Sequence, residues 1–445
     1  MIRPVFEEIR VQTERSSHLL NPGVRKREVA AWAMFDFANS GYTTVVITAV
    51  YNAYFVGVVA GRTAWATFAW TAALAVANAL VILTAPAIGA YADLRACKKR
   101  LLAWTTVGCV LGTAALAWTG PGTLALAIAL VVVSNFCFGT GENLIAAFLP
   151  ELGRAEALGK ISGWGWSLGY VGGLLALGLC LGWIAVAEQR GLSATQAVPG
   201  TLLLTAVLFA LASLPTFLLL RERAVPQQPA AGATGGAGGT FARLADTLHH
   251  ARRYKDLARF LVCVVCYQAG VSTVIAIAAI YAEAAFGFTT AETIQLVLLV
   301  NVTAALGAFG FGQIQDRFGH VRTIAATLLV WLATALLAYF ATTRPLFWLV
   351  ANLAGLALGA SQSAGRALVG YLSPEDRRAE FFGLWGLAVK LSQILGPLTF
   401  GLVTWITHGD QRTAMLVTSV FFVAGLAILA GVNVERGRRA AVEAA

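Results

Sequence analysis

The sequence predicts an all-α polytopic membrane protein with twelve transmembrane helices in two pseudo-symmetric six-helix bundles. Apolar runs of about twenty residues recur along the 445-residue chain, and each can cross a hydrocarbon core of roughly 30 Å as a helix. Charged residues make up only 12% of the chain, about half of the roughly 25% that is usual in soluble domains. Only helices and closed barrels span lipid, and these runs are too long for barrel strands. A charged motif also occurs twice, about half a chain apart, which indicates two like halves.

The first half of the chain is expected to hold six spans. Residues 1–28 are polar and mixed in charge, without the pattern of a cleavable signal peptide, and they are expected to form a cytoplasmic N-terminal segment. Residues 29–220 form the N-terminal bundle, in which short polar stretches separate the apolar runs. The predicted spans are 29–57, 65–91, 99–119, 122–147, 160–187 and 200–220.

The second half repeats this pattern after a cytoplasmic linker, residues 221–258. Residues 226–240 consist of Pro, Gln, Ala, Gly and Thr, which predicts a flexible segment. Residues 241–257 have a partly apolar face opposed by basic residues, which fits either a helix on the inner membrane surface or an ordinary cytoplasmic helix. Residues 259–433 form the C-terminal bundle, and residues 434–445 form a cytoplasmic tail. The predicted spans are 259–284, 293–314, 322–341, 346–371, 380–404 and 413–433.

The distribution of basic residues sets the orientation. With both termini in the cytoplasm, that side holds 26 of the 32 Lys and Arg residues and the opposite loops hold four, as the positive-inside rule requires. The net charge of +10 therefore reflects topology and indicates no nucleic-acid partner. We expect a monomer in the inner cell membrane, in contact with the lipid bilayer and a small-molecule solute. The sequence shows no Gly-rich ATP loop and no metal-ligand cluster, so we expect neither a cofactor nor a metal.

The repeated motif places a Gly four residues before an Asp, and clustered positive charge follows. The first copy contains Asp93 and Arg95, and the second contains Asp316 and Arg317. An offset of 224 residues aligns the two halves and carries Glu142 onto position 366. Repeats of this kind place the substrate between two bundles that rock against each other.

Both copies of the motif resemble the loop signature of the major facilitator superfamily, found between helices 2 and 3 and between helices 8 and 9. Residues 32–42, 161–173 and 379–383 look like the fungal vacuole-effluxer-like family, which has many bacterial members. The resemblance implies the major facilitator fold, alternating access and solute transport, with amino-acid export from the vacuole as the fungal role. One departure is Tyr267-Gln268. The family tends to show Asn-Asp-Gly after this Tyr, so the family's carboxylate in span 7 is missing.

Charged residues inside spans are the first candidates for a transport mechanism. Each costs roughly 2.5–3.5 kcal/mol to insert, so such groups normally face a cavity or a partner. No His lies inside a predicted span, which leaves Asp36 and Glu142 as candidates for proton coupling. Because the repeat places Glu142 opposite Arg366, we expect either a latch on the cytoplasmic side or a static pair of neutralising charges. The four charged residues are Asp36, Glu142, Arg366 and Lys390.

Polar and aromatic residues of the same spans complete the candidate substrate site. Lys390 lies near mid-membrane, where it either binds an anionic group of the substrate, pairs with Asp36, or extends its stem toward the surface. Asn39 lies one helical turn from Asp36 on the same face. Trp164 and Trp166 either line the path or pack against lipid and helices. The candidate substrate-binding residues are Asp36, Asn39, Glu142, Asn143, Tyr267, Gln268, Gln362, Arg366, Trp385 and Lys390.

The repeated motif is the candidate cytoplasmic gate. The superfamily resemblance implies that Asp93 accepts backbone N–H groups near the start of helix 11, at residues 378–380, where the helix dipole is positive. Arg95 and Arg317 are expected to add ion pairs between helices. The alternative is that the basic residues only keep this loop in the cytoplasm. The candidate gate residues are Asp93, Arg95, Asp316, Arg317, Glu142 and Arg366.

These features predict a secondary active transporter that moves a small polar solute by alternating access, driven by a proton or another gradient. An amino acid or similar zwitterion is the expected substrate, because charges of both signs lie in one path. An exporter of amphipathic or drug-like compounds is the alternative within transport. A multi-pass membrane enzyme or a sensor is the alternative of another class. For an enzyme, the sequence offers no convincing nucleophile or catalytic pair. For a sensor, it offers no sizeable soluble output domain.

Overall fold

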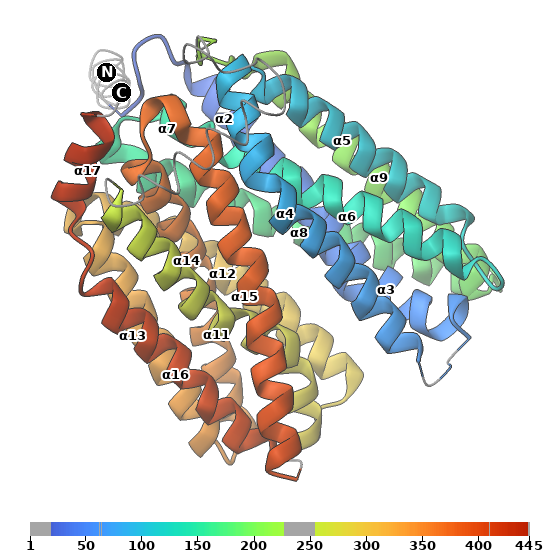
Figure 1. Cartoon of the computed structure of the whole chain (residues 1–445). Helices are drawn as coiled ribbons and strands as arrows, with labels where there is room; N and C mark the ends of the chain where they lie inside the picture. The colour runs from blue at the N-terminus through green and yellow to red at the C-terminus, as the bar shows by residue number, and fades with distance from the viewer. Residues whose placement is uncertain (1–18, 62, 64, 227–253, 409, 444–445) are drawn as a thin grey trace, which may run out of the picture.

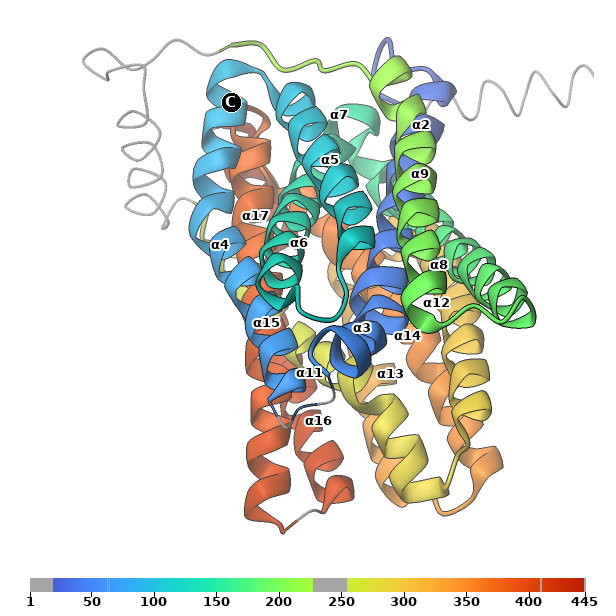
Figure 2. The same ribbon diagram turned by 90° about the vertical axis from the view of Figure 1, so that its right-hand side faces the viewer.

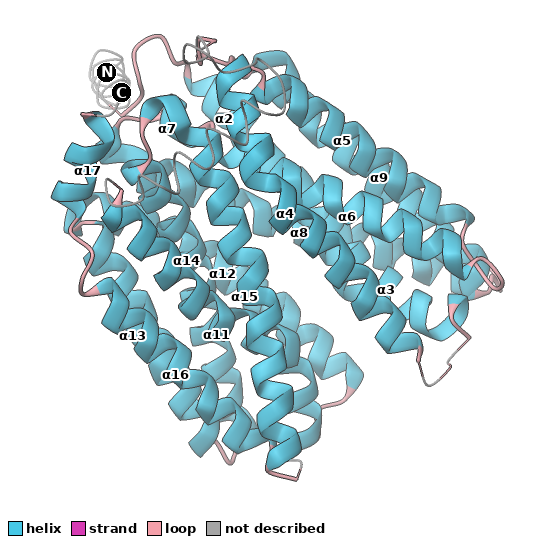
Figure 3. Cartoon of the chain, viewed as in Figure 1, coloured by secondary structure: helices cyan, strands magenta, loops and turns pink. Residues whose placement is uncertain are grey.

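The computed structural model describes residues 19–61, 63, 65–226, 254–408 and 410–443, and within these ranges the protein consists of helices joined by short loops, without strands (Figure 3). Twelve helical segments of the described chain are long and apolar enough to cross a membrane, which is the number that the sequence predicts. The expected surface helix over residues 241–257 lies almost entirely outside the described residues.

The N-terminal half contains six spans. The first consists of α2 (Lys26–Tyr42) followed by η1 (Thr43–Ala49), α3 (Tyr51–Tyr54) and η2 (Phe55–Val59), of which η1 and η2 are π-helical. The remaining spans are α4 (Ala66–Arg95), α5 (Lys98–Ala115) continued by η3 (Leu116–Trp118), α6 (Leu124–Ala146), α8 (Leu158–Gln189) and α9 (Ala194–Leu219), with α7 (Leu149–Leu152) and η4 (Ala155–Ala157) between α6 and α8.

The C-terminal half repeats this arrangement and adds one helix. Its tail forms α17, which packs against the ends of α11 and α14, and there Arg436 donates two hydrogen bonds of 2.7 Å to the carboxylate of Asp256. The helices are α11 (Lys255–Phe286), α12 (Thr290–Phe318), α13 (His320–Phe340), α14 (Arg344–Leu372), η5 (Glu375–Arg377), α15 (Arg378–Ile406), α16 (Gln411–Leu429) and α17 (Val434–Val442).

Short polar signals fix several helix boundaries. At the start of α12, the carboxylate of Glu292 accepts the backbone N–H of Thr289 at 2.8 Å, and the hydroxyl of Thr289 accepts the N–H of Glu292, which is a capping box. Gly319 ends α12 at φ +92°, a conformation that glycine adopts without strain. Asp410 caps α16, and the hydroxyl and N–H of Thr413 that bind its carboxylate hold the pKa of Asp410 below its ordinary value.

In both views α2 begins and α17 lies at the same end of the bundle (Figures 1 and 2). The two halves meet at that end and diverge toward the other end (Figure 1). We call these the terminal end and the distal end. The halves touch where α8 packs against α12 and where α4 packs against α15. Glycines allow both contacts, since a Cβ at Gly163 would collide with the backbone of Ala308, and one at Gly383 with the backbone of Ala85. The closed terminal end is the end that the sequence predicts to be cytoplasmic.

Candidate functional site

An ion pair between Asp36 of α2 and Arg366 of α14 joins the two halves. Arg366 Nη1 donates to Asp36 Oδ2 at 2.7 Å. The other donors of Arg366 bind Ser162 of α8, with Nε donating to the hydroxyl at 3.1 Å and Nη2 to the backbone carbonyl at 2.9 Å. The Ser162 hydroxyl donates in turn to the carbonyl of Ser363 at 2.8 Å. Arg366 therefore extends from the C-terminal half and binds two helices of the N-terminal half.

Aromatic rings and one glycine shape the pocket around this guanidinium. The guanidinium carbon lies 4.7 Å from the ring centre of Trp32 and 5.2 Å from that of Trp166, within the range of a cation–π interaction. A Cβ at Gly165 would collide with both the Asp36 carboxylate and the guanidinium, so only glycine leaves room for the pair. Arg366 is buried, and all three of its nitrogens have protein partners, which a buried charge requires.

A second and looser contact joins Glu142 of α6 to Lys390 of α15. The distance from Glu142 Oε2 to Lys390 Nζ is 3.9 Å, and the side chains are 27% and 7% exposed, respectively. The Lys390 ammonium also lies 5.6 Å from the ring centre of Phe138. Within the described part of the chain, neither side chain makes a hydrogen bond. This contact is longer than the first one and is partly open to solvent.

The hypothesis that Glu142 pairs with Arg366 is wrong, and so is the alternative that Lys390 pairs with Asp36. Glu142 and Arg366, which the 224-residue offset relates, both lie on the fourth span of their half. Helix packing decides the partners, however, because α14 lies against α8 and α15 lies against α6 across the interface. Arg366 therefore pairs with Asp36, and Lys390 pairs with Glu142. The four charged residues expected from the sequence are all paired, but their partners differ from those expected.

Several candidate substrate-binding residues carry polar atoms that are buried and that no other described protein group binds. Such atoms are rare in folded proteins. Gln362 differs, since its Oε1 accepts the hydroxyl of Tyr170 at 2.7 Å, a further contact between halves. Gln268 is buried. The unbound atoms are Asn39 Oδ1, Asn143 Nδ2, Tyr267 OH and Trp385 Nε1.

The sequence analysis missed Ser162, Trp32 and Tyr170, although each contacts a candidate site residue. Ser162, Trp166 and Tyr170 follow one another at intervals of four residues and so share one face of α8. Side chains that carry polar groups at this spacing in an otherwise apolar helix are a sequence signal from which Ser162 and Tyr170 could have been identified. Trp32 gives no comparable signal, since a tryptophan one turn before Asp36 equally fits ordinary packing.

The two motif carboxylates make corresponding contacts at the terminal end. Asp93 Oδ2 accepts the backbone N–H of Glu380, at the start of α15, at 2.9 Å. Asp316 accepts the N–H groups of Gly159 and Lys160, at the start of α8, at 2.9 Å each. Both carboxylates therefore bind the positive end of a helix dipole that belongs to the other half. The Asp93 contact lies where the superfamily resemblance places it.

The basic residues of the motif are arranged less symmetrically. Lys98 lies 4.0 Å from Asp93 and forms an ion pair with Glu151, which ties the start of α5 to α7. Arg95 is exposed. Arg317 is also exposed and makes no ion pair among the described residues, so the expected interhelical pair of Arg317 is absent. Its side chain follows Asp316 at the end of α12 and points to the surface, where a pair gains little.

The arrangement of the helices resembles that of solved transporter structures. The human organic anion transporter MFSD10 (TETRAN) has a TM-score of 0.70 and 16% identity, over 91% of this chain and 99% of that one. FucP in its outward conformation also has a TM-score of 0.70, with 15% identity over 91% of this chain and 98% of that one. These likenesses establish the fold.

Residues 51–442 match the family described as "Vacuole effluxer Atg22 like", and the chain belongs to that family. The "Uncharacterized MFS-type transporter YxiO" of Bacillus subtilis (strain 168) is 26% identical over 411 residues, which cover 91% of this chain and 94% of that protein. Autophagy-related protein 22 of Saccharomyces cerevisiae (strain ATCC 204508 / S288c) is 25% identical over 394 residues, covering 78% of this chain and 74% of that protein. The resemblance of the chain to this family is thereby confirmed, and of the three stretches that carry it, residues 161–173 and 379–383 lie within the matched range. The protein is therefore a multi-pass membrane transporter of the major facilitator type, and not an enzyme.

Proposed function

We propose that this protein is a secondary active transporter of the inner membrane, with both termini cytoplasmic, that moves an amino acid or similar zwitterion as a monomer by alternating access. The observation that carries the proposal is the division of charge between the halves. The N-terminal half supplies both carboxylates, Asp36 and Glu142, and the C-terminal half supplies both bases, Arg366 and Lys390. Any motion that separates the halves at these points must break or exchange these pairs.

The Glu142–Lys390 contact is the better candidate for substrate binding. A zwitterion carries both of the charges that this contact needs, so its carboxylate can bind Lys390 while its ammonium binds Glu142. The contact is long and partly exposed, so inserting a solute displaces little existing interaction. Asn143 follows Glu142 on α6, and its unbound Nδ2 is a further donor for a solute carboxylate.

The Asp36–Arg366 pair is the better candidate for the latch. Like the contacts of Asp93 and Asp316 at the closed terminal end, it links opposite halves. Opening that end requires their loss. A proton on Asp36 would remove one of the two charges that hold Arg366, and a proton on Glu142 would release Lys390, so either carboxylate can couple a proton to the motion.

Transport by the reconstituted protein tests the proposal. Proteoliposomes are loaded with one amino acid at a time and assayed for counterflow of the same labelled amino acid, with and without a pH gradient. We expect saturable counterflow for at least one amino acid and stimulation of net flux by the gradient. Glu142→Gln should lose the stimulation if Glu142 carries the proton, and it should also raise the apparent KM for counterflow because Glu142 binds the solute ammonium, whereas Arg322→Gln, at an exposed site, should behave as wild type. Transport of amphipathic compounds with no amino-acid flux would favour the drug-exporter alternative and contradict the proposed substrate.

A further inference from the structure

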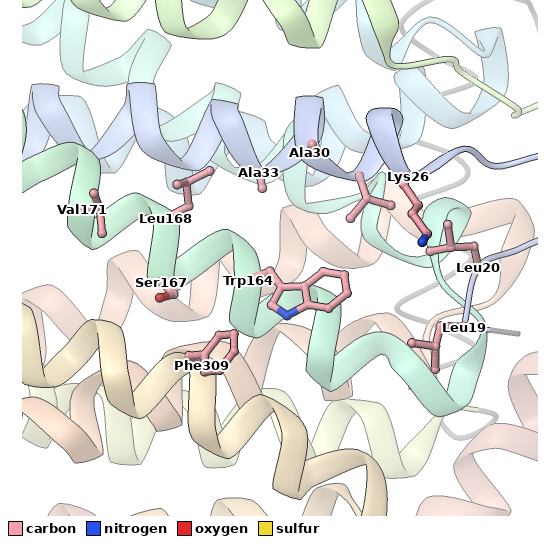
Figure 4. A pocket seen from close by; sticks show the side chains of 11 residues that line it. Leu19, Leu20, Lys26, Ala30, Ala33, Trp164, Ser167, Leu168, Val171 and Phe309 are labelled. Atoms are coloured by element: carbon pink, nitrogen blue, oxygen red, sulfur yellow. The ribbon is translucent and has the colours of Figure 1, made fainter. Parts of the chain in front are cut away.

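A groove on the lateral face of the bundle lies apart from the central charge pairs (Figure 4). Its volume is about 500 Å³, within the roughly 300–1,000 Å³ that is usual for ligand pockets. Helices α2 and α8 of the N-terminal half form most of its wall, and Phe309 of α12 closes it from the C-terminal half. An occupant of the groove would therefore contact both halves at one of the places where they meet.

The wall of the groove is apolar and open on its outer side. Val171 is 47% exposed and Phe309 is 49% exposed, on transmembrane helices whose outer surface faces lipid tails. Trp164 lies in the middle of the groove (Figure 4). Of the two tryptophans considered for the central path, only Trp166 contacts the charge network, while Trp164 faces this groove. A hydrocarbon chain is the membrane component that fits such a surface.

One end of the groove carries a positive charge. Lys26 is the first residue of α2, and its side chain lies beside Leu20 at the end of the groove (Figure 4). Lys26 is exposed, and among the described residues its ammonium makes no hydrogen bond and no ion pair. Lysines at helix ends commonly extend toward the membrane surface. Here the same extension places the charge at one end of an apolar groove, at the start of the first candidate transmembrane segment.

We propose that the groove is a binding site for an anionic phospholipid, with one acyl chain between α2, α8 and Phe309 and the phosphate on Lys26. The terminal end is expected to face the cytoplasmic leaflet, where anionic lipids attract basic residues, and basic pockets between transmembrane helices bind such head groups. This site is separate from the solute path. Its test therefore does not depend on which solute the protein transports.

Fluorescence quenching of Trp164 by lipids with brominated acyl chains tests the proposal in reconstituted bilayers. The Trp164 signal is the difference between wild type and Trp164→Phe, recorded as the fraction of brominated lipid increases. We expect brominated phosphatidylglycerol to quench this signal at a several-fold lower mole fraction than brominated phosphatidylcholine does. Lys26→Gln should remove the difference between the two lipids, because the remaining apolar groove accepts both chains equally.

The matched control is Lys255→Gln. Lys255 is the first residue of α11, occupies the corresponding position of the other half, is exposed and does not line the groove. This variant should keep the preference for phosphatidylglycerol. The double variant Ala30→Leu/Ala33→Leu fills the groove from α2 and should reduce quenching by both lipids. Equal quenching by the two lipids in wild type, or an unchanged preference in Lys26→Gln, would overturn the proposal and leave an ordinary lipid-facing surface.

Discussion

The Asp36–Arg366 pair and the Glu142–Lys390 pair both join opposite halves of the protein, but they differ in length, burial and additional partners. The first is 2.7 Å long, and Ser162 binds the two guanidinium nitrogens that Asp36 does not. The second is 3.9 Å long, and its carboxylate is 27% exposed. The comparison indicates a division of labour, in which a tight pair holds one state of the transporter and a loose pair remains available to the solute.

The energetics of buried charges support this division. Removing one partner of a buried, fully bonded pair costs roughly 3–5 kcal/mol, because the other charge is left without compensation. A longer pair that is partly open to solvent loses less free energy when one partner is removed, since solvent already screens its charges. Substitutions at the first pair should therefore change the conformational equilibrium, and substitutions at the second should change the affinity for the solute.

The largest expected effect belongs to Arg366→Gln. Loss of the guanidinium leaves Asp36 unpaired and removes the bonds to Ser162, so transport should fall about 100-fold, in line with roughly 3 kcal/mol or more for a broken buried pair. Initial rates of counterflow measure this. The double variant Asp36→Asn/Arg366→Gln removes both charges and should fold more stably than Arg366→Gln alone. Wild-type counterflow rates in the single variant Arg366→Gln would refute the role of the Asp36–Arg366 pair as a latch.

Lys390→Gln should act on affinity. Loss of the ammonium that we assign to the solute carboxylate should raise the apparent KM about tenfold, with a smaller change in maximal rate, since a hydrogen bond to a charged group contributes roughly 1.5–3 kcal/mol. Lys390→Arg keeps the charge and serves as the control, with a KM closer to that of wild type. An unchanged KM in Lys390→Gln would remove Lys390 from the solute site.

The two motif carboxylates allow a matched comparison within the gate. Asp316→Asn weakens bonds to the start of α8, and Asp93→Asn weakens a bond to the start of α15, so we expect rates lower by about three- to tenfold in each variant, for charge-assisted bonds of this kind. Rates are normalised to protein in the membrane. If both variants insert into the membrane as the wild type does and transport at unchanged rates, the motif acts only in setting the membrane topology.

The smallest effect is expected for Tyr170→Phe. This change removes the hydroxyl that Tyr170 donates to Gln362 across the halves and keeps the ring. A neutral hydrogen bond contributes roughly 1 kcal/mol, so transport should change by no more than about fivefold. A loss as large as that of Arg366→Gln would show that the latch extends to this bond, and the contrast between the two pairs would then be too simple.

The fold follows closely from the sequence, because long apolar runs, sparse charge and a repeated motif leave few alternatives to twelve helices in two halves. The four charged residues inside spans were also identified, since the cost of inserting a charge makes each of them conspicuous. The carboxylate of Asp93 contacts the start of α15, as the family resemblance implies, because a motif of that length specifies the backbone geometry around Asp93.

The pairing of the charges could not be predicted from the sequence. Pseudo-symmetry relates Glu142 to Arg366, but it does not say which side chain reaches across the interface, where α14 packs against α8 and α15 packs against α6. Ser162 and Gly165 decide the result by providing a hydroxyl and the space for the guanidinium. Such small residues carry no charge signal in a chain that is rich in glycine and alanine. The lateral groove was missed because it is formed by helices of both halves.

The most direct test of the latch is the distance between the halves at both ends of the bundle. Spin labels are placed in a protein whose six native cysteines are replaced, at Arg100→Cys with Arg322→Cys on the terminal end and at Arg190→Cys with Thr342→Cys on the distal end, all at exposed positions. Pulsed electron paramagnetic resonance then gives the distance distributions. We predict that Arg366→Gln shifts the terminal pair to longer distances and the distal pair to shorter ones. Distributions identical to those of the unsubstituted background would contradict the account.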